Sequence, residues 1–268
     1  MASSEMLVRA LAGFAAASLI AVGAYRARAL DKSGAVAASL TGSAAAAAGW
    51  SWGALLILYF VVSSLLSRIR RAERDAKTDG VVEKSGARDA TQVLANGGIF
   101  ALSALMAPFG PPIFSIAMRH AALGALAASA ADTWATELGT VFGGTPRSLR
   151  TFAPVQPGTS GAVSAAGCIA MAGGAVFLAL SAGWLGLSPR IALVALAGIV
   201  GALVDSVLGA TLQDRRWCDI CDMASEQHVH RCGAATRLAG GRGWMDNDVV
   251  NLLSTFAGAA IAAGVANL

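Results

Sequence analysis

Long apolar segments recur along the whole of this chain, and they restrict its fold more than any other feature. Eight of them are found, at roughly 7–24, 35–49, 51–67, 91–107, 113–131, 161–185, 189–211 and 248–267. Each is long enough, or nearly so, to cross the hydrocarbon core of a bilayer. With a mean hydropathy of +0.61 and 13% charged residues, the chain is too apolar for a water-soluble globule. The sequence therefore predicts an all-α fold, a polytopic membrane bundle of about eight transmembrane helices, within a range of seven to nine.

Alanine and glycine, rather than leucine, make up much of these segments, and the chain holds 31 glycines in all. Small side chains let helix backbones approach closely in a membrane, where apolar surface alone does not drive helices together. The composition thus predicts a tightly packed bundle. Neither a fixed-period repeat nor a linker between two cores is visible, so we expect a single integral-membrane domain over residues 1–268.

Basic residues are concentrated on one side of the predicted bundle. With eight spans, alternate loops hold 17 of the 20 Lys and Arg residues, which leaves Arg9, Arg119 and Arg190 for the other side. Because lysine and arginine are retained in the cytoplasm, we expect both termini outside and every long loop inside, in the inner or cell membrane of a bacterium. The net charge of +4 then reflects membrane topology, and no nucleic-acid partner is expected.

Three loops on the predicted cytoplasmic side are long enough to carry chemistry. Residues 68–90 mix both charge signs and are expected to form a solvated helical connector that turns at Gly80 and Gly86. Residues 132–160 contain GGTPRSLRTFAPVQPGTSG, whose prolines and glycines exclude a regular helix. Residues 212–246 form a Cys/His loop that carries every cysteine except Cys168.

Asp205 is the most anomalous polar residue in the sequence. It interrupts the apolar run RIALVALAGIVGALVDSVLGATLQ, and a charged residue at the centre of a membrane helix costs about 2.5–3.5 kcal/mol on insertion scales. Because it lies about two helical turns from the cytoplasmic end, we expect its carboxylate to face a polar cavity that opens to that side. The structural alternative is a carboxylate satisfied by Ser206 or by an interhelical hydrogen bond.

Other carboxylates are predicted at the same membrane face. Asp132 and Glu137 close the fifth apolar segment, and Asp246 and Asp248 open the last one in WMDNDVVNLLSTF. Clustered oxygen ligands suit a hard cation, and Mg²⁺ held by one or two carboxylates together with substrate phosphates is a common arrangement. The sequence thus predicts a magnesium site. As an alternative, Asp246 or Asn247 serves only as a helix N-cap.

The stretch VQPGTSGAVS, residues 155–164, has the composition of an anion-binding turn. Glycines let backbone N–H groups turn inward, hydroxyls add donors, and the following helix is expected to offer its positive N-terminus. The signal is weak by itself, because it is neither a Walker A motif nor a Rossmann fingerprint. Arginines of the same loop would add counter-charge for a phosphate. The residues predicted to bind phosphate are Pro157, Gly158, Thr159, Ser160 and Gly161, with Arg147 and Arg150.

The third loop contains CDICDMASEQHVHRC, in which Cys218 and Cys221 form a C-x2-C pair. Together with Cys232 and His228, or His230 in its place, they would complete a four-ligand site of the zinc-knuckle type. A structural Zn²⁺ that folds the loop is the preferred interpretation, and a loop without metal or a redox-active pair are the alternatives. The cytoplasmic position argues against a stable disulfide.

Six segments occur in an order that resembles a known membrane family. They are DKSGAVAASLTGSAAAAAGWSWGALLILYFVVSSLLSR, RDATQVLANGG, ADTWATELG, VQPGTSGAVS, GALVDSVLGATLQ and WMDNDVVNLLST. Over nearly its whole length the chain resembles the integral-membrane family (domain of unknown function 92) that includes plant phytyl-phosphate kinase and animal transmembrane protein 19. That family is in turn distantly similar to the CTP-dependent dolichol and phytol kinases and to phosphatidate cytidylyltransferases.

The resemblance implies a CTP and Mg²⁺ site at the cytoplasmic face, built from four motifs. These are an Asp-Thr pair, a proline-glycine-threonine phosphate loop, a helix Asp/Glu-Ser pair and a late acidic segment. A phosphate-loop lysine, a His-Gly-Gly segment and a basic doublet found in the distant relatives are absent from this chain. The matching residues are Asp132 and Thr133, then Pro157, Gly158, Thr159, Ser160 and Gly161, then Asp205 and Ser206, and last Asp246 and Asp248.

Metal carboxylates and a phosphate turn on one face favour phosphoryl or nucleotidyl transfer. We expect Asp132, Asp205 and Asp248 to be catalytic and a nucleoside triphosphate to be the donor. The resemblance implies that the donor is CTP and that the acceptor is an isoprenyl monophosphate such as phytyl or geranylgeranyl phosphate in the lipid bilayer. Such an acceptor is already anionic and needs no strong general base. The alternatives are a cytidylyltransferase acting on a lipid phosphate and a non-enzymatic transporter or scaffold.

Overall fold

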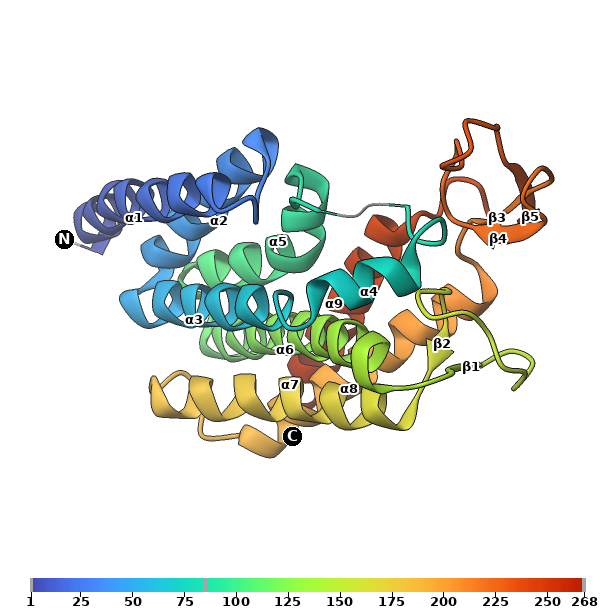
Figure 1. Ribbon diagram of the computed structural model, residues 1–268. Helices are drawn as coiled ribbons and strands as arrows, with labels where there is room; N and C mark the ends of the chain where they lie inside the picture. The colour runs from blue at the N-terminus through green and yellow to red at the C-terminus, as the bar shows by residue number, and fades with distance from the viewer. Residues whose placement is uncertain (1, 84–85, 267–268) are drawn as a thin grey trace.

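The computed structural model describes residues 2–83 and 86–266, which form a bundle of long helices with short strands gathered at one end (Figure 1). Lys84 and the last residue of the final apolar segment lie outside the described residues. The helices are α1 (Ala2–Arg26), α2 (Lys32–Ala48), α3 (Trp50–Leu66), α4 (Arg71–Thr78), α5 (Ala90–Met106), the 3-10 helix η1 (Ala107–Phe109), α6 (Pro112–Phe142), α7 (Ala165–Trp184), α8 (Ile191–Thr211) and α9 (Asn247–Val265). The strands are β1 (Arg147–Ser148), β2 (Ala162–Val163), β3 (Arg215–Cys218), β4 (Met223–Ser225) and β5 (Arg237–Gly240).

All eight apolar segments form helices, as predicted. Among the described residues, six helices are long and apolar enough to cross a membrane, namely α1, α5 with η1, α6, α7, α8 and α9. The count becomes seven if α3 and α4, which are bent by 75° at their junction, form one broken span. The helices α2 and α3 are each 17 residues long, so they are shorter than the roughly 20 residues that a straight span needs.

Helix α6 is the centre of the bundle. It packs against α5, α7, α8 and α9, and every residue from His120 to Ala131 is buried. A helix that is apolar and buried on all sides is typical of a core. The predicted boundary at residue 131 was wrong, because the polar residues that follow do not break the helix, which continues to Phe142. Asp132 and Glu137 thus lie within a helix, and the second loop begins only at Gly143.

Small residues set the spacing of the helices around α6. A side chain at Gly124 would collide with the backbone of Gly258 in α9, and one at Gly201 in α8 would reach Ala128 of α6. Hydrogen bonds between helices add to this packing, since Ser254 Oγ donates to Gly201 O at 3.0 Å and Thr255 Oγ1 donates to Ala95 O at 2.9 Å. The tight bundle expected from the alanine and glycine content is therefore present.

The loops contain short β-strands, which an all-α description does not include. In the second loop β1 and β2 pair antiparallel, and in the third β3 lies between β4 and β5 in an antiparallel sheet. Both small sheets lie at the same end of the bundle, opposite the N-terminus (Figure 1). In the predicted connector 68–90, the helical part is α4, and the chain turns with positive φ at Gly80 and Gly86. The functional loops therefore gather over one end of the helices.

Candidate functional site

A cavity of about 330 Å³ lies at this end of the bundle, between α4, α5, α6, α8, α9 and the second loop. Many of its lining groups are oxygens or amides, which sets it apart from the apolar bundle beneath. It brings together segments that are far apart in the sequence. The predicted site residues that line it are Asp132, Thr133, Glu137, Pro157, Gly158, Thr159, Ser160, Gly161, Asp205, Ser206 and Asp248.

Two aspartates face each other at the base of this cavity. Asp132 comes from α6 and Asp205 from α8, and their carboxyl groups are close enough for their charges to interact. The neighbour of the second, Ser206, donates to Ala202 O at 3.2 Å, so it does not cap Asp205. Asp205 Oδ2 is buried and has no hydrogen-bond partner among the described residues. A buried acceptor with no donor beside a second carboxylate is an arrangement that a cation would relieve.

The groups around the pair fit a hard divalent cation. Asp248 and Asn251 of α9 line the same cavity, and each is only 9% exposed. Mg²⁺ is bound by carboxylate and carbonyl oxygens and usually keeps positions for water or phosphate. Oxygen ligands from three helices, with open volume beside them, meet this requirement.

Asp246, the other acidic residue of this segment, has a structural position. It is the N-cap of α9, and its side chain accepts a hydrogen bond from Val249 N at 2.9 Å. It is not among the residues that line the cavity. Asp246 therefore serves as a helix N-cap, which was the alternative given for it, and we leave it out of the proposed metal ligands.

The predicted phosphate loop lies between two helices. Thr159 N and Thr159 Oγ1 both donate to Gln156 O, which closes a tight turn. Gly158 lies within this turn with a φ of +89°, and Gly161 follows it with a φ of +69°. At Gly161 the loop touches the backbone of Ala210 in α8, so a Cβ there would collide with it. Glycine is required at this position both for its positive φ and for the close approach.

The helix after this loop begins later than predicted. Strand β2 intervenes, α7 starts at Ala165, and its N-terminus is capped by Ser164 Oγ, which accepts from Gly167 N at 3.1 Å. The residues Ser164 and Gly167 still line the cavity. The end of α7 is thus part of the wall, but one of its donors is already satisfied.

The positive charge of the cavity comes from residues that the sequence analysis did not single out. Arg147 and Arg150 are exposed and do not line it, and Arg147 Nη1 donates to Phe152 O at 2.8 Å instead. They were assigned to the site because they are close to the phosphate loop in sequence, but β1 directs this part of the loop away. Arg74 of α4 and Arg88, just before α5, line the cavity in their place.

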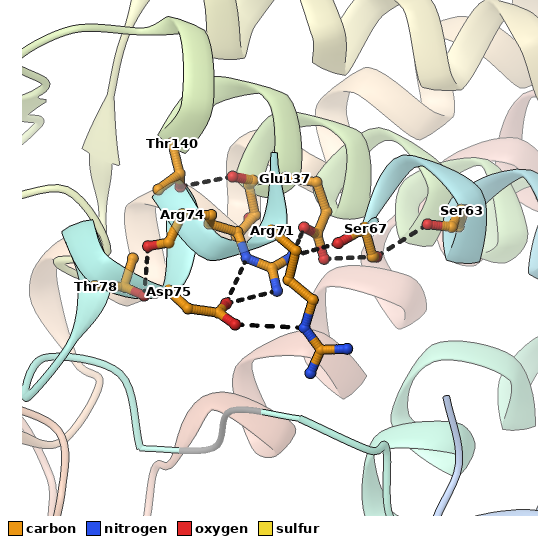
Figure 2. Close-up of polar contacts among 9 residues, drawn as sticks. Ser63, Ser67, Arg71, Arg74, Asp75, Thr78, Glu137 and Thr140 are labelled. Atoms are coloured by element: carbon orange, nitrogen blue, oxygen red, sulfur yellow. Dashed lines mark hydrogen bonds and ion pairs between the residues drawn. The ribbon is translucent and has the colours of Figure 1, made fainter. Parts of the chain in front are cut away.

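Arg74 connects α4 to α6 through Glu137 (Figure 2). Both Arg74 and Glu137 line the cavity. The guanidinium of Arg74 pairs with both Glu137 and Asp75, and Ser67 Oγ donates to Glu137 Oε1 at 2.7 Å. Lys77 adds a bond to Val141 O at 2.9 Å. Each carboxylate oxygen of Glu137 therefore has a partner, and this residue anchors α4 to α6. Its role as a metal ligand stays a prediction.

The third loop contributes Glu226 to the same cavity. Glu226 N donates to Val81 O at 2.7 Å, Gln227 Nε2 donates to Val82 O at 3.1 Å, and Ser160 Oγ donates to the Glu226 carboxylate. Burial raises the pKa of Glu226 to about 7. The third loop thus touches both the connector after α4 and the phosphate loop. A single glutamate in a polar loop gave no sequence signal of this role.

The end of the third loop holds a compact cluster of metal-binding side chains. The ligand atoms of Cys218, Cys221, His230 and Cys232 all lie within 4.8 Å of one another. The distance from Cys218 Sγ to Cys232 Sγ is 3.6 Å, and that from His230 Nδ1 to Cys232 Sγ is 3.3 Å. Tetrahedral Zn²⁺ with Zn–S bonds of about 2.3 Å places its sulfurs about 3.8 Å apart. The cluster therefore fits Zn²⁺ closely.

The histidine in this cluster is His230, and not His228 as first assigned. A turn, in which Gly233 N donates to His230 O at 2.8 Å, brings His230 beside Cys232. His228 precedes that turn, and its Nε2 lies 3.7 Å from Asp214 Oδ2. The hydrogen bond from His230 lowers the pKa of Cys232 to about 6, which favours the thiolate that binds a metal.

The fold and the site together define an integral membrane protein with an oxygen-rich cavity at one end of its helix bundle. The chain belongs to the family described as integral membrane protein DUF92, whose model matches residues 15–259. This agrees with the resemblance noted from the motifs.

Individual relatives are similar to this chain over most of its length. The chain is 32% identical over 261 residues to Protein PGR of Arabidopsis thaliana, with 88% of this chain and 89% of that protein covered. It is 28% identical over 239 residues to Protein VTE6, chloroplastic, of the same plant, with 87% and 64% covered. An uncharacterized membrane protein of Synechocystis, sll0875, is 32% identical over 223 residues and covers 82% of this chain and 76% of its own length. No solved structure shows a significant match.

Proposed function

We propose that the protein is a membrane kinase that transfers the γ-phosphoryl group of a nucleoside triphosphate, CTP in our proposal, to an isoprenyl monophosphate. The observation that carries the proposal is the facing pair Asp132 and Asp205, which lies in one cavity with the glycine turn 157–161. The resemblance of the motifs to a family that includes plant phytyl-phosphate kinase supports the same reaction. We further propose that the cavity faces the cytoplasm of a bacterial cell.

Asp132, Asp205 and Asp248 would hold Mg²⁺, which when bound neutralises charge on the transferred phosphoryl group. Backbone N–H groups of the turn at 157–161 would hold the donor phosphates, and Arg88 would face the acceptor phosphate. An acceptor oxygen bonds to the γ-phosphorus while the bond from that phosphorus to the β,γ-bridging oxygen breaks. The products are the prenyl diphosphate and the nucleoside diphosphate. Because the acceptor is already an anion, the residues only have to position it.

The Cys/His cluster supports a second, structural metal. We propose that Zn²⁺ bound by Cys218, Cys221, His230 and Cys232 fixes the third loop. The loop in turn holds Glu226 against the phosphate turn. The cluster would thus support the cavity without contacting substrate.

The test is an assay of the purified protein in lipid nanodiscs with Mg²⁺, one of the four common nucleoside triphosphates and geranylgeranyl monophosphate. We expect geranylgeranyl diphosphate and CDP when CTP is the donor. Pyrophosphate and a CDP-linked lipid would instead establish cytidylyl transfer. If no lipid product forms with any nucleotide, the kinase proposal is wrong, and flux of an ion that depends on Asp205 would support the transporter alternative.

A further inference from the structure

A second cavity lies beside the first and has the opposite character. It has a volume of about 120 Å³ and is enclosed by α1, α2, α3 and α5. Nearly all of its walls are aliphatic, aromatic or small side chains, as is usual for a site that binds an apolar group. Its apolar walls include Ile20 and Ala21 of α1, Ala38 of α2, and Leu56 and Phe60 of α3.

The two cavities share a boundary. Arg88, Gln92, Asn96 and Thr133 line both of them. Thr133 follows Asp132 directly in α6, so the apolar cavity meets the polar one beside the proposed metal ligands. A ligand with an anionic head and an apolar tail could therefore occupy both cavities at once.

Three polar side chains at and beside this boundary, those of Tyr59, Ser129 and Asn96, are connected by hydrogen bonds. Tyr59 OH and Ser129 Oγ are 2.7 Å apart, Ser129 Oγ donates to Asn96 Oδ1 at 2.8 Å, and Asn96 Nδ2 donates to Gln92 O at 2.9 Å. An alkyl chain that passes these groups would not leave a buried donor or acceptor unpaired. The chain of hydrogen bonds from α3 through α6 to α5 also fixes the shape of the wall.

Arg88 supplies charge at the same point. Within the described part of the chain, no carboxylate forms an ion pair with its guanidinium, whereas Arg74 is neutralised by Glu137 and Asp75. An arginine without a carboxylate partner at the edge of an apolar cavity suits a phosphate monoester.

The structure points to this second cavity as the site for the isoprenoid chain of the acceptor. We propose that the phosphate lies at Arg88 and that the part of the chain nearest to the phosphate lies between α1, α2, α3 and α5. This inference rests on the proposed kinase function. From Gln92 to Gly97 the cavity follows α5 for about 7.5 Å, so it can hold only the beginning of a long isoprenoid. Ile20 and Ile57 at its edge are 38% and 41% exposed on the lipid-facing surface, where the rest of the chain would enter the bilayer.

Photocrosslinking tests this placement without any need for catalysis. The probe is a geranylgeranyl monophosphate with a diazirine near its phosphate end, added to the wild-type protein in nanodiscs. We expect labelled peptides from α1, α2, α3 or α5, with labelling suppressed by an excess of unmodified geranylgeranyl monophosphate. Labelling confined to other helices, or not suppressed by the competitor, would overturn the placement. If the expected peptides are labelled but the protein forms no diphosphate, the kinase function is refuted while the proposed binding site is supported.

A matched pair of glycines on α5 provides a second test. Gly97 lines the cavity, and a Cβ there would meet only Thr41 Cγ2, at 3.4 Å, whereas its neighbour Gly98 has room and does not line the cavity. Gly97→Leu should therefore fill the deep end of the cavity and raise the KM for geranylgeranyl monophosphate by about tenfold or more. The same variant should handle the five-carbon dimethylallyl monophosphate within about threefold of wild type, and Gly98→Leu should match wild type with both acceptors. Equal kinetics of Gly97→Leu and Gly98→Leu would contradict the proposal.

Discussion

The carboxylate pair inside the bundle and the Cys/His cluster at its end differ in ligand chemistry, in spacing along the chain and in access. Asp132 and Asp205 are oxygen ligands from two separate helices, and open volume lies beside them. Cys218, Cys221, His230 and Cys232 come from one loop and form a set of three sulfur donors and one nitrogen donor. A metal site with free positions can act on substrate, whereas a closed tetrahedral site stabilises a fold. We therefore propose that the first cluster takes part in the chemistry and that the second supports the fold.

The largest effect is expected at the carboxylate pair. Asp205→Asn keeps the shape of the side chain but removes its charge, so transfer should fall by about 10²–10³-fold while zinc content stays unchanged. Turnover in the prenyl-phosphate assay, with zinc measured by elemental analysis, checks both parts. Asp219→Asn, at an exposed carboxylate that pairs with Arg237, is the control. A variant at position 205 with more than about a tenth of wild-type activity would contradict the assignment.

At the Cys/His cluster we expect the opposite result, in which the zinc content changes more than the activity does. Cys218→Ser should reduce zinc from about one ion per chain to nearly none and lower the thermal stability of the third loop. Activity should fall by only about tenfold, because the aspartates remain while the docking of Glu226 is weakened. Cys168→Ser, on α7, is the control for metal content. Equal zinc in Cys218→Ser and wild type would show that the cluster does not hold the metal.

A smaller effect is expected where the phosphate turn contacts α8. Gly161→Ala adds a Cβ that collides with Ala210, so the turn must shift, and the KM for the nucleotide should rise by about tenfold. Gly144→Ala is the matched control, because its φ of +63° is close to the +69° of Gly161 but nothing lies within 4 Å of the added atom. If both variants have the same KM, the strain of positive φ would explain the effect and the contact would not.

The smallest effect concerns Glu226, which links the two regions. Its pKa is raised by burial from 4.5 to about 7, so the folded protein binds this proton more tightly than the unfolded chain does. The unfolded chain ionises the group first as the pH rises, which lowers the stability of the folded state progressively between about pH 4.5 and pH 7. Glu226→Gln does not titrate, so its melting temperature relative to wild type should increase by a few °C from pH 5 to pH 8 in magnesium-free buffer. A difference that is constant with pH would contradict the raised pKa of Glu226.

The sequence predicts the helices well because an apolar run of spanning length has few alternatives in a membrane. The boundary of α6 was missed because a polar residue such as Asp132 can continue a helix when it faces a cavity. Similarly, the Cys/His ligands could be predicted from local spacing, apart from the choice between His228 and His230, which depends on one turn.

The residues that line the cavity could not all be predicted from their spacing in the sequence. Asp132, Asp205 and the turn at 157–161 were identified through their resemblance to known motifs and their unusual context. Arg88 and Glu226 were not, because a charged residue in a polar loop is the normal case and only the packing of distant segments places them. Arg147 and Arg150 are the opposite case, because they are close to the phosphate turn in the sequence but do not line the cavity.

The most direct test of the account is Mn²⁺ binding followed by electron paramagnetic resonance, with Mn²⁺ in place of Mg²⁺ and CTP at saturation. The wild-type protein is expected to bind one Mn²⁺ tightly per chain at the carboxylate pair. Asp132→Asn and Asp205→Asn should each weaken this binding by at least about tenfold, whereas Cys218→Ser should leave it within about threefold of wild type. Unchanged Mn²⁺ affinity in both aspartate variants would contradict the claim that Asp132 and Asp205 form the catalytic metal site.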